Sequence, residues 1–325
     1  MPIYLGVDAG GSKTYAMVAD EHGRTLGTGK SGNGNHQLDR DGAAANIRDA
    51  VLQALAEAGR SVGEVAYSFF GLSGADREAD YRILHPMIKP LGLPEYRISC
   101  DTMIALRAGT YQPHGVVLIC GTGTNCAGRD RKGNELQIGG FGSMYGDYGG
   151  GADIAIDAFK AVIRHWEGRG FATSLTAEML RVYGYPDVAT MFHDFLDRNL
   201  TRVPLSIVPC LFAEAAKGDL VSGSILTKQG RELGLSAQAM IRRLELEQDS
   251  FDVVLAGSVV TKGEGPFVFE PIERAVRQVA PHARVVKLQA EPVIGAILSA
   301  MDAAGAQVPA EVDRTLREVR FEKTV

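Results

Sequence analysis

The chain has 325 residues, of which 45% are hydrophobic and 22% are charged, and its formal net charge is -5. At roughly 150 residues per domain, this length predicts about two domains, and the composition excludes a globally disordered chain. The acidic balance argues against nucleic acid or a membrane surface as a partner, because both need a basic protein surface.

Four cysteines are present, and none of them forms a C-x-x-C pair. Their spacing suits neither a disulfide framework nor a structural zinc site, so we expect small buried apolar residues. No stretch reaches the roughly 20 apolar residues of a membrane span, and no basic region followed by a long apolar segment opens the sequence. We therefore expect a cytoplasmic protein. The cysteines are Cys100, Cys120, Cys126 and Cys210.

The first third of the chain alternates between predicted strands and helices. A buried strand ends in the glycine turn of "YLGVDAGGSK", and two further strands surround His22-Gly23. The segment 40–59 predicts a helix, because Ile47, Val51 and Leu55 fall on one face. Further on we expect a strand in "EVAYSFFGLSG", a helix near 76–88, a strand in "YRISCD" and a helix from "TMIALRAG".

At residue 115 the pattern restarts with "GVVLICGTGTNCAG", again a strand, a glycine turn and a strand. This similarity predicts a weak internal duplication, with chance likeness of two glycine turns as the alternative. Alternating strands and helices predict an α/β fold of two lobes with a ligand cleft between them. We expect an N-terminal lobe over 1–112 and a C-terminal lobe over 113–325. In the second lobe we expect a helical insertion at about 151–245, a strand and a glycine turn at 252–260, and a strand in "RVVKLQ". We also expect a helix at 291–305 that can pack back on the first lobe, and a short amphipathic helix in the tail.

The turn after the first strand, "DAGGSK", combines an acid, bare backbone, a hydroxyl and a cation. Adjacent glycines leave no Cβ to block a phosphate, and successive N–H groups can bind an anion. Asp8 fits such a site if Mg²⁺ lies between it and the phosphates, usually through water. An ordinary hairpin turn is the alternative. The candidate phosphate-binding residues are Gly10, Gly11, Ser12, Lys13 and Thr14.

Two later turns have a similar character. "CGTGTNCAG" adds a second glycine and hydroxyl turn, so that one turn from each lobe would hold a polyphosphate. "LAGS" follows a strand as well, and its glycine would let a base or ribose lie against the chain; a plain strand-to-helix turn is the alternative. The candidate residues are Gly121, Thr122, Gly123, Gly257 and Ser258.

Three polar residues are candidates for substrate chemistry. Asp101 ends a strand and opens a helix, so it is either a helix cap or a general base that accepts a hydroxyl proton during phosphoryl transfer. Asn35 in "SGNGNHQ" offers a donor and an acceptor to sugar hydroxyls, or lies in a plain loop. Asp147 precedes a helix among glycines, where capping is the alternative.

Taken together and in order, these motifs resemble the N-acetylglucosamine kinase family of the actin-like ATPase superfamily. That family is grouped with the activator ATPases of benzoyl-CoA reductase and 2-hydroxyacyl-CoA dehydratase. The resemblance runs from about residue 3 to 300, with "GVDAGGSKT" and "GTGTNC" as phosphate motifs and "AGS" as the adenosine motif. It implies two actin-like, ribonuclease H-like lobes around a nucleotide cleft.

The resemblance also implies roles for single residues. Asp101 falls on the catalytic base, and Ser12, Thr122 and Gly257 fall on nucleotide-binding positions. The implied sugar-binding residues are Asn35, Thr124, Asn125 and Asp147. The chain departs from the family at Phe141, where "GGWG" is common, and at Tyr148, where the family has Glu.

The implied function is ATP- and Mg²⁺-dependent phosphorylation of an amino sugar at its 6-hydroxyl by a cytoplasmic homodimer. N-acetylglucosamine is the first candidate, and glucosamine and N-acetylmuramic acid remain open. The alternative is a non-sugar ATPase that activates a dehydratase or reductase. Such activators carry cysteines that bridge an iron–sulfur cluster, and the four cysteines here offer no convincing equivalent.

Overall fold

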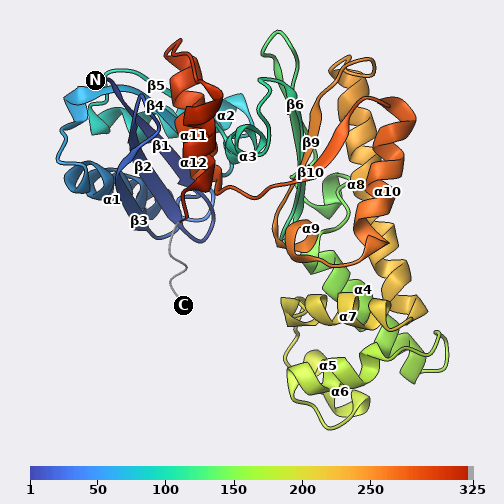
Figure 1. Cartoon of the computed structure of the whole chain (residues 1–325). Helices are drawn as coiled ribbons and strands as arrows, with labels where there is room; N and C mark the ends of the chain where they lie inside the picture. Colours follow the sequence, from blue (N-terminus) through green and yellow to red (C-terminus); the bar gives the residue numbers. More distant parts are fainter. Residues whose placement is uncertain (321–325) are drawn as a thin grey trace. The chain divides into compact units, whose positions relative to one another are not determined.

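The computed structural model describes residues 1–320, which form two compact units. Met1–Val117 and the described residues from Leu288 on make up the first unit, and Leu118–Lys287 makes up the second. Each unit is built on one five-stranded sheet with helices against it (Figure 1). The first unit is therefore assembled from both ends of the described chain.

The first sheet combines antiparallel and parallel pairing. Its first three strands form an antiparallel meander, in which β1 pairs with β2 and β2 with β3. On its other side β1 pairs in parallel with β4, and β4 in parallel with β5. The strand order is β3 (Thr25–Ser31), β2 (Thr14–Asp20), β1 (Ile3–Ala9), β4 (Val65–Leu72) and β5 (Tyr96–Cys100).

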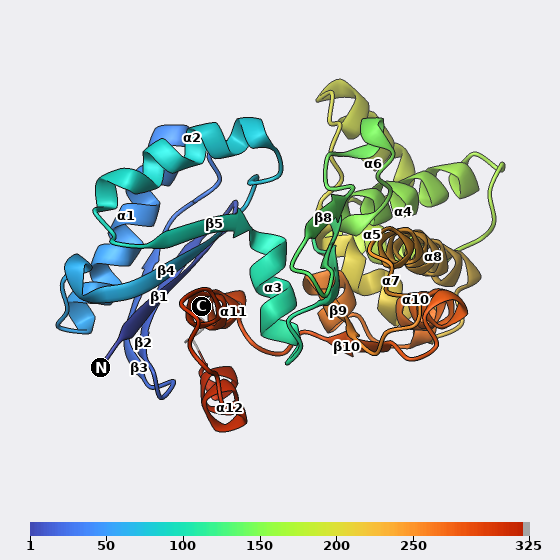
Figure 2. The ribbon, with the colours of Figure 1, turned by 90° about the horizontal axis from the view of Figure 1, so that it is seen from above.

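Helices cover both faces of this sheet. On one face lie α1 (Arg40–Glu57) and α2 (Glu78–Ile88), and α11 (Pro292–Ala303) lies on the other (Figure 2). The alternation of β1 explains the division, because Leu5 and Val7 pack with α1 whereas Tyr4 packs with α11. Both faces of the sheet are buried in this way.

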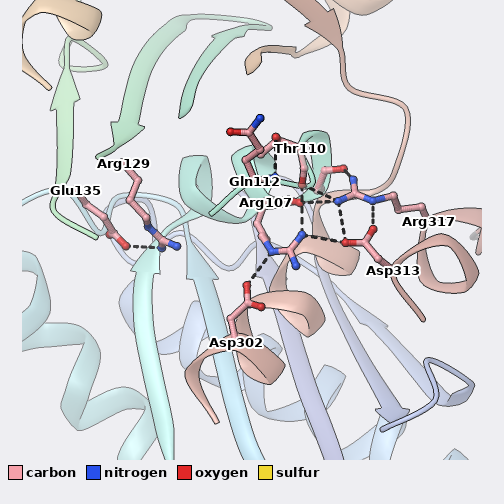
Figure 3. A network of polar contacts seen from close by, with 9 residues as sticks. Arg107, Thr110, Gln112, Arg129, Glu135, Asp302, Asp313 and Arg317 are labelled. Carbon is pink, nitrogen blue, oxygen red and sulfur yellow. Dashed lines mark hydrogen bonds and ion pairs between the residues drawn. The ribbon is translucent and has the colours of Figure 1, made fainter. Parts of the chain in front are cut away.

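The helix α12 (Ala310–Glu318) is bound to α3 (Asp101–Gly109) by a polar network (Figure 3). The buried Arg107 guanidinium donates to Asp302 Oδ2 at 2.8 Å and to Asp313 Oδ2 at 3.1 Å. Arg317 bonds to Asp313 and to three carbonyl oxygens at the end of α3, those of Arg107, Ala108 and Thr110. These carbonyls lack partners inside α3, so Arg317 caps that helix from a distant part of the chain.

Most helices of the second unit, α4 to α8, follow one another in the sequence between β8 and β9. Its sheet has the order β10 (Arg284–Lys287), β9 (Asp252–Ala256), β6 (Gly115–Cys120), β7 (Thr124–Arg129) and β8 (Glu135–Ile138). The long helix α8 (Leu220–Arg243) packs along α10 (Pro266–Val279). An Arg129–Glu135 ion pair of 2.6 Å joins β7 and β8 (Figure 3). The helices are α4 (Gly150–Trp166), α5 (Leu175–Tyr183), α6 (Val188–Asp197), α7 (Val208–Ala216), α8 (Leu220–Arg243), α9 (Ser258–Lys262) and α10 (Pro266–Val279).

The predicted α/β class is confirmed, and most predicted elements match closely. The helix expected over 40–59 is α1, and the helix expected near 76–88 begins at Glu78, after Arg77 as its N-cap. The amphipathic tail is α12, which buries Val312 and Leu316. Within residues 1–320, no helix combines the length and apolar character that crossing a bilayer requires.

Candidate active site

The strand register gathers three chain segments at one edge of the first sheet. Ala9 of β1 is opposite Leu72 of β4, and Leu72 is opposite Cys100 of β5. Because the three strands are parallel, the residues that follow them leave the sheet at the same edge. Those residues include Ser73, whose N–H donates to the Ala9 carbonyl at 2.9 Å, and Asp101. In open α/β sheets this carboxyl edge is the usual place for ligands.

Asp101 is the first residue of α3, directly after β5. The N-cap position of α3 is occupied by Cys100, which makes no side-chain capping bond within the described chain. Asp101 is therefore not the N-cap, which was one of its two predicted roles. Burial, together with the charge of Asp76, raises the pKa of the Asp101 carboxyl to about 6. A carboxylate with such a pKa is ionised at neutral pH and is a stronger base than an exposed aspartate.

The thiol of Cys100 lies between two carboxylates that the sequence reasoning did not connect. Its Sγ is 3.4 Å from Asp76 Oδ1 and 3.4 Å from Asp101 Oδ1. The hydrogen bond to Asp101 lowers the pKa of that carboxyl and opposes the effect of burial. Asp76 belongs to the loop after β4 and matches no motif, so only the parallel register of β4 and β5 brings it here.

Asp8 is a second acidic group in the same unit and is partly buried near the end of β1. Burial and the neighbouring charge of Asp101 raise its pKa to about 7, and Glu291 acts in the same direction while Lys13 opposes it. Negative charge is therefore in excess here. The arrangement fits a divalent cation, although residues 1–320 hold no group of three metal-binding side chains. Mg²⁺ retains several waters, so contact with Asp8 through water agrees with this donor set.

The first glycine turn, which is the predicted phosphate-binding loop, lies largely at the surface. Gly10 N–H donates to the Lys13 carbonyl at 2.9 Å, which closes the turn, and Gly11, Ser12 and Lys13 are exposed. The Lys13 ammonium lies 4.5 Å from the ring centre of Tyr15. Thr14 differs from the others: it is fully buried, and its hydroxyl donates to the Gly32 carbonyl at 2.9 Å, so its hydrogen-bonding is internal.

Asn35 is held in place by its own side-chain bonds. Its Nδ2 donates to Ser73 Oγ at 3.1 Å, and its Oδ1 accepts from the Gln37 N–H at 2.8 Å. Ser73 follows β4 directly, so this bond places Asn35 at the same sheet edge as Asp101. The sequence reasoning missed Ser73, although its position after a buried strand that ends in a glycine turn was a usable signal.

The second and third glycine turns lie against each other within the second unit. A Cβ at Gly257 would be 2.5 Å from the Cys120 carbonyl carbon and 2.8 Å from the Gly121 nitrogen, and Gly257 has a φ of +92°. Glycine is therefore required at 257 by close approach and by backbone conformation. Thr122, Gly123 and Ser258 are exposed around this contact.

Backbone hydrogen bonds from the start of α4 hold the second glycine turn, residues 121–123, in place. Gly151 N–H donates to the Gly121 carbonyl at 2.7 Å, and Ala152 N–H donates to the Thr122 carbonyl at 3.0 Å. With its carbonyls bound in this way, the turn leaves other polar groups facing solvent. A helix N-terminus also favours a nearby anion through its partial positive charge.

Three of the predicted sugar-binding residues line a single cavity in the second unit. Thr124, Asn125 and Asp147 border a cavity of about 140 Å³, together with Tyr148 and Glu232. An ordered water needs roughly 10–15 Å³ of such volume, so the cavity has room for a polar group much larger than water. The Asn125 Oδ1 is buried and has no hydrogen-bond partner among residues 1–320, so it is an acceptor that a bound hydroxyl or amide would satisfy.

The Asp147 carboxylate does not cap α4. Its Oδ2 accepts from the Phe141 N–H at 2.7 Å and from the Gly142 N–H at 2.6 Å, so it stabilises the preceding glycine loop. The residue that follows, Tyr148, donates its hydroxyl to Asp157 Oδ2 at 2.5 Å. Lys228 lies over the Tyr148 ring at 3.8 Å and bonds to the same carboxylate. The segment that carries Asp147 is thus fixed on both sides.

The model of the BadF/BadG/BcrA/BcrD ATPase family matches residues 5–300, and the chain belongs to that family. The resemblance predicted from the ordered glycine motifs is thereby confirmed.

The chain aligns with two curated relatives over nearly the whole length of each. The N-acetylmuramic acid/N-acetylglucosamine kinase of Clostridium acetobutylicum is 27% identical over 303 residues, covering 92% of this chain and 98% of the relative. The N-acetyl-D-glucosamine kinase of Dictyostelium discoideum is 28% identical over 317 residues, with the same coverage.

Solved structures agree on the fold. A putative N-acetylglucosamine kinase from Chromobacterium violaceum superposes with a TM-score of 0.65 at 21% identity, covering 92% of this chain and 98% of that one. A ROK family glucokinase from Streptomyces griseus, in complex with glucose and AMPPNP, gives 0.58 at 19% identity, covering 92% and 99%. The predicted fold class, with two actin-like lobes, is confirmed.

Proposed function

We propose that the protein transfers the γ-phosphoryl group of ATP to the 6-hydroxyl of an amino sugar, with N-acetylglucosamine as the first candidate. The observation that carries this proposal is the register of β1, β4 and β5, which puts Asp101 and the Asn35–Ser73 pair at one sheet edge. Family membership and the names of the two full-length relatives support the substrate class. Glucosamine and N-acetylmuramic acid are the alternative substrates.

In this proposal Asp101 is the general base. Its carboxylate accepts the proton of the attacking hydroxyl, and the raised pKa suits that task near neutral pH. Phosphoryl transfer needs mainly positioning, charge neutralisation and such a proton acceptor. Cys100, which donates to Asp101, holds the carboxylate in one orientation.

We assign the nucleotide to the exposed glycine turns. Gly10, Gly11, Ser12 and Lys13 in the first unit and the turns at 121–123 and 257–258 in the second offer backbone N–H groups and hydroxyls to phosphates. Mg²⁺ would be held through water by Asp8 and would supply the positive charge that neutralises the triphosphate. Thr14 supports the first turn from inside the fold.

We assign the sugar to Asn35, Thr124, Asn125 and Asp147. Asn35 is aligned by Ser73, and the other three border the cavity of the second unit, where no described residue bonds to the Asn125 Oδ1. Carboxylates and amides bind hydroxyls well because each accepts or donates more than one hydrogen bond. We also propose a cytoplasmic location, which the four free cysteines support, and a homodimer, which light scattering tests.

The experiment that tests the proposal is an ADP-release assay with MgATP and a panel of neutral and amino sugars. We expect sugar-dependent ADP release that is fastest with an amino sugar, and a product phosphorylated at the 6-position by NMR. ADP release that is independent of every sugar would instead indicate a nucleotide-driven activator and would refute the kinase assignment.

A further inference from the structure

One residue of the sugar-assigned cavity, Glu232, matches no motif of the sequence. It lies on α8, one turn before Ser236, and both residues border the cavity together with Asn125 and Asp147. The helix is fixed against β7, because Cys126 Sγ contacts the Ser236 carbonyl at 3.6 Å. Glu232 is therefore placed by a rigid element of the unit and not by a loop.

Two acidic residues, Asp147 and Glu232, are among those that border the cavity. Asp147 is partly satisfied by two backbone N–H groups, whereas the Glu232 carboxylate has no hydrogen bond or ion pair with another side chain among residues 1–320. The described residues that border the cavity include no lysine, arginine or histidine. Lys228, beside the Tyr148 ring, is bound to Asp157. The cavity therefore presents negative charge to whatever enters it.

We propose that Glu232 is a specificity-determining residue that makes the cavity select amino sugars with a neutral or cationic substituent and reject those with an anionic one. This inference rests on the proposed function. Candidate amino sugars differ in charge: N-acetylglucosamine is neutral, glucosamine carries an ammonium group, and N-acetylmuramic acid carries a lactyl carboxylate. A like charge placed against an unpaired carboxylate is strongly disfavoured, whereas an ammonium or amide N–H is attracted to it.

The proposal predicts opposite effects for opposite charges. Glu232→Gln keeps the shape of the side chain and removes its charge, and Glu232→Lys reverses the charge. Relative to N-acetylglucosamine, kcat/KM for N-acetylmuramic acid should rise at least tenfold from the native protein to Glu232→Lys, with Glu232→Gln between them. The ratio of kcat/KM for glucosamine to that for N-acetylglucosamine should fall from the native protein to Glu232→Lys, again with Glu232→Gln between them.

The readout is the ratio of kcat/KM for two sugars on one protein sample, measured with MgATP at pH 7. Such a ratio does not depend on the fraction of active protein, so a variant that folds poorly still gives an answer. The matched control is Glu270→Gln, an exposed carboxylate on α10 away from this cavity, which should leave both ratios unchanged.

Calorimetric titration of each sugar, together with the kcat/KM ratios, separates the specificity role of Glu232 from the kinase assignment itself. If the native protein phosphorylates sugars but the ratios stay constant in both Glu232 variants, the specificity role is refuted and the kinase assignment stands. If no sugar is bound or phosphorylated by the native protein, the kinase assignment fails, and the role of Glu232 fails with it.

Discussion

Gly295 of α11 lies directly against Ile104 of α3, because a Cβ at residue 295 would stand 1.9 Å from the Ile104 carbonyl oxygen. The same Cβ would be 2.7 Å from the Ala108 nitrogen, so two backbone atoms of α3 occupy the space. The helix that begins with Asp101 is thus fixed by backbone contact with α11, and its position depends on a residue without a side chain.

Gly295→Ala should separate these two helices. Overpacking in a tight interior typically costs about 1–3 kcal/mol, and we expect a loss of that size in the free energy of unfolding measured with urea. We also expect a lower kcat, because α3 carries Asp101. Gly63→Ala is the control: no atom of the described part of the chain lies within 4 Å of a Cβ at this exposed position, so stability should change by less than about 0.5 kcal/mol.

The two aspartates that bind Arg107 should differ greatly in their contribution to stability. The Asp313 side chain is 5% exposed and contacts both Arg107 and Arg317, whereas Asp302 is 38% exposed. Asp313→Asn leaves two guanidinium groups without their shared carboxylate and should cost about 3–5 kcal/mol. Asp302→Asn should cost about 1 kcal/mol or less. Equal losses in urea unfolding of the two variants would contradict this account of the network.

Asp101→Asn should lower kcat by at least about 100-fold, which is the lower range for loss of a general base. The circular dichroism spectrum and the midpoint of thermal unfolding should show that the variant remains folded. Asp41→Asn, an exposed change in α1, should have a native rate. A native rate in Asp101→Asn would remove Asp101 from the proposed role.

The pH dependence of kcat/KM should report the surroundings of Asp101. The base must be ionised, and its pKa is raised to about 6, so activity should fall as the pH drops below that value. Asp76→Asn removes a negative charge that raises this pKa, and it should shift the acid limb to lower pH by about 0.5 unit or more. Cys100→Ala removes a hydrogen bond that lowers the pKa and should shift the limb upward. Shifts in the same direction would contradict this assignment.

The sequence predicted the fold well because its signals are local. Buried strands that end in glycine turns, and apolar residues at helical spacing such as those of α1, depend only on neighbouring residues. Among the candidate residues of these motifs, six lie at exposed positions of the glycine turns: Gly11, Ser12, Lys13, Thr122, Gly123 and Ser258. Thr14 shows the limit of such reasoning, because its hydroxyl belongs to a motif but is bound internally to Gly32.

The residues that the sequence did not predict depend on contacts between distant segments. Ser73 meets Asn35 and Asp76 meets Cys100 because β4 pairs with β1 and β5, which no local pattern specifies. Glu232 reaches its cavity because α8 packs on β7, more than 100 residues earlier in the chain. Pairings of this kind are set by the tertiary fold and not by propensity.

The composition of the first unit from both ends of the described chain has a consequence for biosynthesis. A ribosome releases β1, β4 and α3 long before α11 and α12, whose residues Val293, Ile297 and Leu316 complete the core on one face of the first sheet. That apolar face lacks these helices while Leu118–Lys287, a continuous stretch, is being made. During vectorial synthesis the first unit therefore cannot complete its core before α11 and α12 emerge.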